Sequence, residues 1–306
     1  MSEQFSRRCG RGSVGAAAAA DVAYLSRSMF EGGAANPADV ADLIAFDRLV
    51  AADAPEWAAF FAEAVSSYLL RQASPVDIVD VEKADWLMSE LAPNGSLVES
   101  PRGLPLLLRV MEGARSVAPS LPAFALRQLR TAIITGEGPL AAGRVHFSRV
   151  VDAGDVALMR RILIAGGGGE GRPVSRAEAD ALFDIHDATI DATNDADFEP
   201  LFLRALMQHL RAASGHGVGS RRGALQAEIS RNLLPGLDLL AAAGYRPDPA
   251  SLVESVSLSP GSANWLAERI LRDGRVSRAT RALKTLLVTE TVMLEDSLRA
   301  LLDRAA

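Results

Sequence analysis

Large apolar residues recur at intervals of three and four positions along two stretches of the chain, which is the pattern of an amphipathic helix. One stretch runs from Trp57 to Tyr68 and the other from Phe198 to His209. Each predicts a helix with one apolar face packed in a core. Upstream helix starts are indicated by Asn36 before a proline, and by Ser175 with a glutamate three positions later, a capping box.

The chain also repeats itself, with two kinds of segment in alternation. The first kind, X, combines a pair of large apolar residues with a downstream aromatic stripe, as in Leu43–Ile44 with Glu56–Phe61 and in Leu182–Phe183 with Asp197–Phe202. The second kind, Y, places a turn glycine at one fixed distance after a tryptophan, as in Trp86–Gly95 and Trp265–Gly274. The order X1, Y1, X2, Y2 predicts a tandem duplication of a unit of roughly 120 to 150 residues.

The duplication sets the expected domain boundaries. We expect a disordered leader at 1–20, a first helical unit at 21–135, a linker at 136–151 that contains glycines and a proline, and a second helical unit at 152–305. An insertion rich in glycine and proline, 214–260, belongs to the second unit and is expected to be mostly loop around one helix.

Composition indicates the fold class. The 306 residues are 49% apolar, enough to bury a sizeable core, while aromatic residues make up 5% and β-branched residues are sparse beside alanine, leucine and arginine. These propensities predict an all-α fold, a multi-helix bundle. The formal net charge of -6 argues against nucleic acid as the main ligand, because a duplex binder needs a positive face.

The sequence excludes several catalytic signatures. The two lysines, Lys83 and Lys284, follow no glycine-rich loop, so a P-loop and a protein-kinase lysine are absent. The single cysteine, Cys9, excludes disulfide frameworks and thiolate zinc sites within one chain. The zinc-peptidase and nucleophile-elbow motifs are missing as well. The sequence therefore favours a role other than catalysis, with an enzyme of an unrecognised class as an alternative.

The N-terminus bears a superficial likeness to an export signal. Arg7 and Arg8 precede an alanine-rich stretch that ends at Asp21 after about seven residues, at the short limit for a signal sequence. We therefore expect a cytoplasmic protein, with twin-arginine export as the alternative. No window reaches about 18 uninterrupted apolar residues, so no membrane span is expected.

A glycine motif, Gly166-x-Gly168-x-x-Gly171, follows the apolar run Ile162–Ala165 and would form a dinucleotide-binding turn if that run were a strand. The matching stretch of the first copy, Tyr24–Gly33, instead has the pattern of a short amphipathic helix that ends at glycines. We therefore expect a helix at this run and no dinucleotide cofactor.

The richest polar cluster lies between residues 184 and 199. Asp184, Asp187 and Asp191 share a helix face at i, i+3 and i+7, and Asp195 in the following turn adds a fourth carboxylate. Carboxylate oxygens are ligands for hard cations, so these four residues form the candidate site for a divalent cation. The alternative is a solvated acidic helix face, with His186 as a surface or capping histidine.

Arginines fall at every third position in the second Y segment, at Arg269, Arg272, Arg275, Arg278 and Arg281. These five less Glu268 and Asp273 give residues 263–282 a charge of +3, whereas Arg102 less three acidic residues gives the matching 84–103 a charge of -2. The row gains most from nearby carboxylates, so it predicts contact with an acidic partner protein or with the acidic first copy of a second molecule. A solvated arginine face is the alternative.

The Y segments, Trp86–Leu87 with Asn94–Gly95 and Trp265–Leu266 with Asp273–Gly274, resemble the helical TerB-like proteins. The X-Y-X-Y layout also resembles uncharacterised duplicated helical proteins of proteobacteria. The TerB-like resemblance implies a stress-linked module that binds divalent cations through carboxylates.

The glycine turns of the Y segments also resemble the second half of an EF-hand loop. Thr280 and Pro101 stand where that loop needs a bidentate glutamate, so we do not expect calcium at either turn. Three functional hypotheses follow: a non-catalytic interaction or scaffold protein, a TerB-like cation-binding module, and an enzyme of unrecognised class. The first accounts best for the different charges of the two copies.

Overall fold

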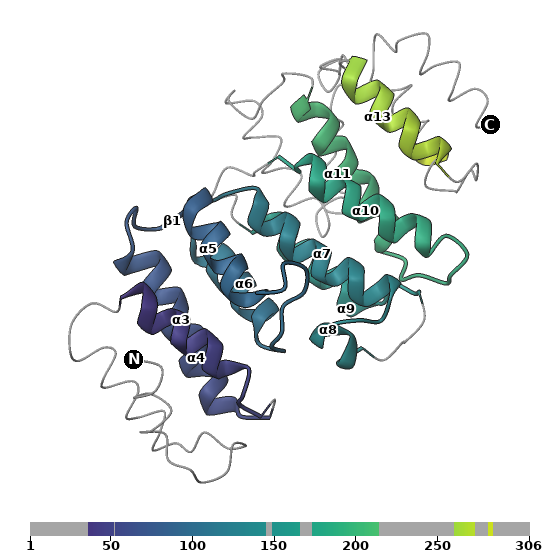
Figure 1. Ribbon diagram of the computed structural model, residues 1–306. Coiled ribbons are helices and arrows are strands. Elements are labelled where there is room, and N and C mark those ends of the chain that lie inside the picture. Colours follow the sequence, from purple (N-terminus) through teal and green to yellow (C-terminus); the bar gives the residue numbers. More distant parts are fainter. Residues whose placement is uncertain are drawn as a thin grey trace, which may run out of the picture. The chain divides into compact units, whose positions relative to one another are not determined.

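The structure is a computed structural model that describes residues 36–51, 53–144, 149–165, 173–213, 260–272 and 281–283 (Figure 1). Within these residues the chain is helical apart from loops and one pair of parallel strands, β1 (Ile78–Val79) and β2 (Ser116–Val117). The predicted all-α fold is confirmed. In this part of the chain no helix is long and apolar enough to cross a bilayer.

The chain divides into two compact units, one of residues 1–149 with 164–168 and one of residues 150–163 with 169–306. The predicted linker contains the main division and also a short helix, α8 (Pro139–Ala142). Several sequence predictions fall outside the described residues. They concern the leader with Cys9, the glycine motif at 166–171, the insertion as far as residue 259, Gly274, Arg275 and Arg278.

The first unit packs its helices around the apolar stripe that the sequence predicts. Within the described residues its helices besides α8 are α3 (Pro37–Asp47), α4 (Pro55–Ser67), the π-helix η1 (Tyr68–Gln72), α5 (Val81–Leu91), α6 (Gly103–Gly113) and α7 (Ser120–Ile134). Trp57 and Phe61 of α4 are fully buried, and Phe46 of α3 meets the Trp57 ring edge-on. Trp86 of α5, the tryptophan of the first Y segment, is only half-buried.

A buried ion pair joins the end of α3 to the start of α6. The carboxylate of Asp47 accepts hydrogen bonds from Arg102 and from Nε1 of Trp57, the latter at 2.7 Å. Arg102 also donates to the carbonyls of Asp47, Val50 and Ala51. The guanidinium of Arg102 supplies donors to carbonyls at and just after the end of α3. The ion pair therefore holds the loop that leads into α4 in place.

A buried lysine fastens η1 and the loop after it to α5. The ammonium of Lys83 donates to the carbonyls of Leu69, Ala73, Pro75 and Ile78 at 2.6 to 2.9 Å. Burial lowers the pKa of Lys83, and the charges of Asp80 and Asp77 partly oppose this shift. We call this arrangement the lysine cage; sequence spacing did not predict it.

In the described part of the second unit the helices are α9 (Ala153–Ile164), α10 (Arg176–Ala188), α11 (Phe198–Ala213) and α13 (Pro260–Leu271). The run Ile162–Ile164 lies in α9, so its predicted helical state is confirmed. Phe183 of α10 meets both Phe202 of α11 and Trp265 of α13 edge-on, with ring centroids 5.2 and 5.6 Å apart. These three rings form the aromatic centre of the unit.

His186 corrects the expectation of a surface or capping histidine. Its ring is buried and lies flat on Phe202, with centroids 4.6 Å apart and an interplanar angle of 7°. The physical reason is periodicity: position 186 continues the buried stripe of Ala179, Leu182 and Phe183, so its side chain must enter the core.

Helix α3 of the first unit and helix α10 of the second begin in the same way and bury matching positions. Asn36 caps α3 by accepting the Asp39 N–H at 3.0 Å, and Ser175 caps α10 by accepting the Glu178 N–H at 3.3 Å. Buried positions coincide as well when the two caps are aligned: Val40, Leu43, Ile44 and Asp47 in α3 match Ala179, Leu182, Phe183 and His186 in α10.

A ring contact repeats between the later helices of each unit. In the first unit Tyr68 lies edge-on to Trp86, with ring centroids 6.0 Å apart. In the second unit His209 lies edge-on to Trp265 at 5.0 Å. The repeat pattern of the sequence pairs these same positions, Tyr68 with His209 and Trp86 with Trp265.

Candidate functional site

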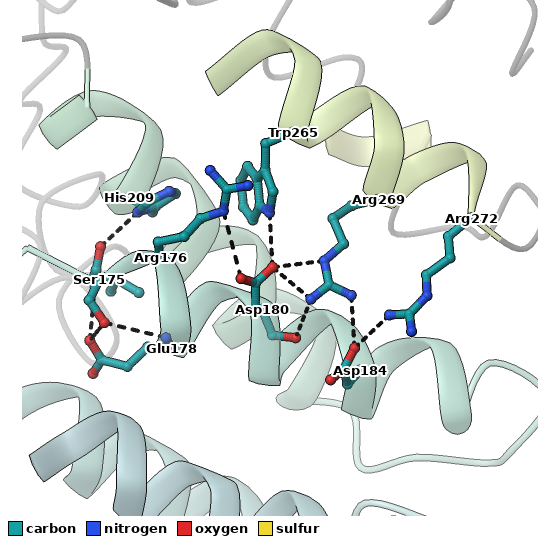
Figure 2. A network of polar contacts seen from close by, with 10 residues as sticks. Ser175, Arg176, Glu178, Asp180, Asp184, His209, Trp265, Arg269 and Arg272 are labelled. Atoms are coloured by element: carbon teal, nitrogen blue, oxygen red, sulfur yellow. Dashed lines mark hydrogen bonds and ion pairs between the residues drawn. The ribbon is translucent and has the colours of Figure 1, made fainter. Parts of the chain in front are cut away.

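Two aspartates of α10 face two side chains of α13 and the arginine that directly follows this helix (Figure 2). Asp180 and Asp184 are one turn apart on α10, and Trp265, Arg269 and Arg272 follow one another at intervals of four and three positions on α13 and the turn after it. Each set therefore lies on one helix face. Together with Arg176 in the first turn of α10, these charged and aromatic side chains form a group that we call the arginine clasp.

Asp180 is the centre of the arginine clasp. Its Oδ1 accepts a hydrogen bond from the indole Nε1 of Trp265 at 2.9 Å, and two from Arg269, from Nε at 2.8 Å and Nη2 at 2.6 Å. Its Oδ2 lies 3.7 Å from Nε of Arg176 in the first turn of α10. One carboxylate thus satisfies polar groups on both helices.

Asp184 carries the second half of the arginine clasp. Its Oδ1 accepts from Nη1 of Arg269 at 2.8 Å and from Nη1 of Arg272 at 2.9 Å. Only 13% of the Arg269 side chain is exposed, against 58% for Arg272. Burial lowers the pKa of Arg269, but the hydrogen bonds and charges of Asp180 and Asp184 outweigh it and raise that pKa above its ordinary value.

Trp265 is enclosed by polar as well as apolar neighbours. The guanidinium of Arg176 lies over its ring at 4.4 Å from the centroid, a cation–π contact. His209 meets the ring edge-on, and its Nδ1 donates to the Val174 carbonyl at 2.8 Å. This bond places the proton of a neutral His209 on Nδ1.

The structure does not bring the four predicted cation ligands together. Asp184 is engaged by two arginines, and Asp187 lies 3.2 Å from the ring of His186. Asp191 is exposed after the end of α10, and Asp195 accepts from the Asp197 N–H. Among the described residues, no three acidic, histidine or cysteine side chains are grouped to hold a metal.

The structure divides the arginine row predicted to bind a partner. Arg269 and Arg272 turn towards α10 and pair with its aspartates. Arg275 and Arg278 lie outside the described residues, and Arg281 is exposed in the last described segment. The sequence reasoning missed Asp180 and Arg176, although Asp180 stands one turn before Asp184 and could have been found from that spacing.

Comparison with known proteins gave no match: neither a family model, nor a curated protein, nor a solved structure matches this chain. The TerB-like resemblance therefore rests on the short motifs of the Y segments alone, and it stays a prediction.

The chemistry of the arginine clasp is that of ion pairing. Among the described residues, three guanidiniums, of Arg176, Arg269 and Arg272, meet two carboxylates, so these groups together carry one positive charge in excess. The excess sits at the surface, because the side chains of Arg176 and Arg272 are 53% and 58% exposed. The arrangement fits the binding of a further carboxylate better than the binding of a cation.

Proposed function

We propose that the protein is a non-catalytic helical interaction protein, and that the arginine-bearing end of α13 docks a partner protein with an acidic surface. The observation that carries this proposal is the excess positive charge of the arginine clasp. A carboxylate from outside balances that charge and adds hydrogen bonds to guanidiniums that are already held in place.

The arginines divide the work in this proposal. Arg269 is a positioning residue, because it is nearly buried and spends its donors on α10. More than half of the Arg272 side chain is exposed, and the sequence continues from it to Arg275 and Arg278 at the same spacing. We assign partner contact to Arg272, Arg275 and Arg278, with Arg176 at the edge of the contact surface.

A separate acidic protein is a better partner than the first copy of a second molecule. Glu99, one of the acidic residues predicted for self-association, already pairs with Arg48 at 2.9 Å and accepts from Asn94 at 2.8 Å. The charge of Glu99 is therefore already balanced within its own unit, which favours a different protein as the source of the carboxylates that complete the clasp.

The proposal includes the duplication of one helical unit. It is supported by the matching caps of α3 and α10, by the matching buried positions of these helices, and by the repeated ring contact of Trp86 and Trp265. An interaction protein with two diverged copies explains why the cores agree while the charges differ.

The experiment uses a labelled oligoglutamate peptide as the probe and fluorescence anisotropy at low salt, where exposed charges are least screened. The full chain with Arg275→Glu and Arg278→Glu is expected to bind the peptide at least about fivefold more weakly than the wild type, about 1 kcal/mol. Its melting temperature is expected to stay close to that of the wild type.

A matched control makes the same change in net charge elsewhere. Arg71→Glu with Arg115→Glu alters two exposed arginines of the first unit and is expected to leave peptide binding within about twofold of the wild type. Equal losses in the two variants would show that the peptide senses net charge only, and the proposed docking site would then be wrong. Sedimentation of both variants tests self-association in parallel.

A further inference from the structure

The helix that carries the tryptophan of the Y segment, α5 in the first unit and α13 in the second, is held by charged groups, but the groups differ between the units. In the second unit α13 brings Arg269 against Asp180 and Asp184 of α10. In the first unit the matching positions on α3 are Ala41 and Ala45, which carry no charge. The position on α5 that matches Arg269 is Glu90, so α5 has a negative charge where α13 has a positive one.

The first unit relies instead on the lysine cage. Lys83 of α5 is buried and donates to four carbonyls that lie between residues 69 and 78 of its own unit. The matching position on α13 is Ser262, which is buried and carries no charge. Helices α5 and α13 thus each carry one cation that only their own unit accommodates.

The apolar positions of the two helices do not differ enough to tell them apart. The buried apolar residues of α5 are Ala84, Leu87 and Leu91, and those at the same positions of α13 are Ala263, Leu266 and Ile270. Volume-conserving exchanges of this kind cost little in a core. Apolar packing alone would therefore let either helix dock in either unit.

The charges forbid this exchange. If α5 docked against α10, Glu90 would face Asp180 and Asp184, and the ammonium of Lys83 would be buried without its carbonyls. If α13 docked against α3, Arg269 would face two alanines and lose both carboxylates. In each case a charge loses its partners away from water, which costs far more than an exposed charge does.

We infer that the lysine cage and the arginine clasp act as two different specificity labels. They make α5 and α13 each dock in its own unit and not in the other. This inference rests on the proposed duplication but not on the proposed acidic partner. A label is needed because duplicated units in one chain present each helix with two similar docking grooves.

The test is hydrogen exchange of the full chain, followed by mass spectrometry of peptides from α10, α11 and α13. The charge-exchange variant, Ser262→Lys with Arg269→Glu, gives α13 the charges of α5. The matched apolar-exchange variant, Ala267→Met with Ile270→Leu, gives α13 apolar residues of α5. A third variant adds Asp180→Asn and Asp184→Asn to Arg269→Glu, which removes the like charge but keeps an acceptor for Trp265.

We expect the charge-exchange variant to speed exchange of the α13 amides at least about tenfold, while the apolar-exchange variant stays within about threefold of the wild type. The asparagines should slow exchange again relative to Arg269→Glu alone, because the repulsion is gone. The inference is overturned if the apolar exchange is as damaging as the charge exchange. It is also overturned if the asparagines add to the loss from Arg269→Glu. Unchanged α11 peptides distinguish release of α13 from unfolding of the unit.

Discussion

The indole Nε1 of Trp265 donates a 2.9 Å hydrogen bond to Oδ1 of Asp180, although 85 positions separate the two residues in the sequence. The same oxygen accepts two bonds from Arg269. A single carboxylate of α10 therefore meets the polar groups of two poorly exposed side chains of α13. We therefore expect docking of α13 to depend on Asp180 more than on any other residue of α10 in the arginine clasp.

Replacing Asp180 should destabilise the second unit. Asp180→Ala leaves the Trp265 N–H and two donors of Arg269 without their acceptor, so we expect a loss of about 2 kcal/mol in the free energy of unfolding. Urea denaturation followed by circular dichroism measures it. Glu268→Ala, an exposed change on the same helix, serves as the control and should cost less than about 0.5 kcal/mol. Similar losses for the two variants would mean that the clasp contributes nothing specific.

The features that sequence predicted correctly are local ones. The stripe from Trp57 to Val65 and the capping box at Ser175 depend on neighbours within one or two helical turns, so spacing alone identifies them. The same kind of local pattern, the spacing of carboxylates in the densest acidic stretch, predicted Asp184 and Asp187 as cation ligands. It could not show that Asp184 meets arginines 85 and 88 positions further along the chain.

The lysine cage was out of reach of sequence for a different reason. The four acceptors of Lys83 are backbone carbonyls, and a carbonyl has no residue type that a pattern could detect. Their convergence depends on the wide turn of η1, where the Ala73 N–H bonds the Tyr68 carbonyl at 2.8 Å, and on the loop that follows. Only the rarity of lysine in this chain hinted that Lys83 is special.

Removing the cation of the cage should destabilise the first unit. Lys83→Met keeps the length of the side chain but leaves its four carbonyls without this donor, and we expect a loss of about 3 kcal/mol in the free energy of unfolding. Asp85→Met, an exposed change on the same helix, should cost less than about 0.5 kcal/mol. Thermal and urea denaturation of both variants decide the matter. A Lys83→Met protein as stable as the wild type would show that the cage is dispensable.

The same lysine predicts a dependence of stability on pH. Burial holds the folded pKa of Lys83 below its ordinary value of 10.5, so the unfolded chain binds this proton more tightly than the folded chain. As the pH rises from the folded pKa towards 10.5, the folded chain loses the proton first and gains stability relative to the unfolded chain. The free-energy difference between the wild type and Lys83→Met should therefore widen in this window.

Tyr68 works in the opposite direction and must be separated from this effect. Burial raises its pKa above 10.0, so the unfolded chain ionises first and stability falls above that pH. Both proteins contain Tyr68, so its contribution cancels in their difference. A difference that narrows as the pH approaches 10.5 would contradict the lowered pKa of Lys83.

Calcium should leave the melting temperature unchanged at millimolar concentration. At the Gly95 turn Glu99 already bonds Arg48 and Asn94, and at the predicted cation site Asp184 is held by two arginines. Differential scanning fluorimetry with and without calcium tests both. A rise in melting temperature that disappears on Glu99→Gln would show that the Gly95 turn binds calcium, contrary to this prediction. A rise that disappears on Asp187→Asn with Asp191→Asn would instead support the predicted cation site.

The matching helix caps predict that each unit responds to its own cap. Asn36→Ala and Ser175→Ala each remove an acceptor for an N–H in the first turn, and each should cost about 1 kcal/mol. Hydrogen exchange should show faster exchange in α3 for the first variant and in α10 for the second, because the chain divides between these helices.

If the caps are equivalent, Asn36→Ser and Ser175→Asn should both be nearly neutral. In each the new side chain still accepts the N–H, and the first-turn carboxylate of Asp39 or Glu178 still accepts a bond from the cap. Slower or faster exchange in both helices for either alanine variant would mean that the two units do not unfold separately.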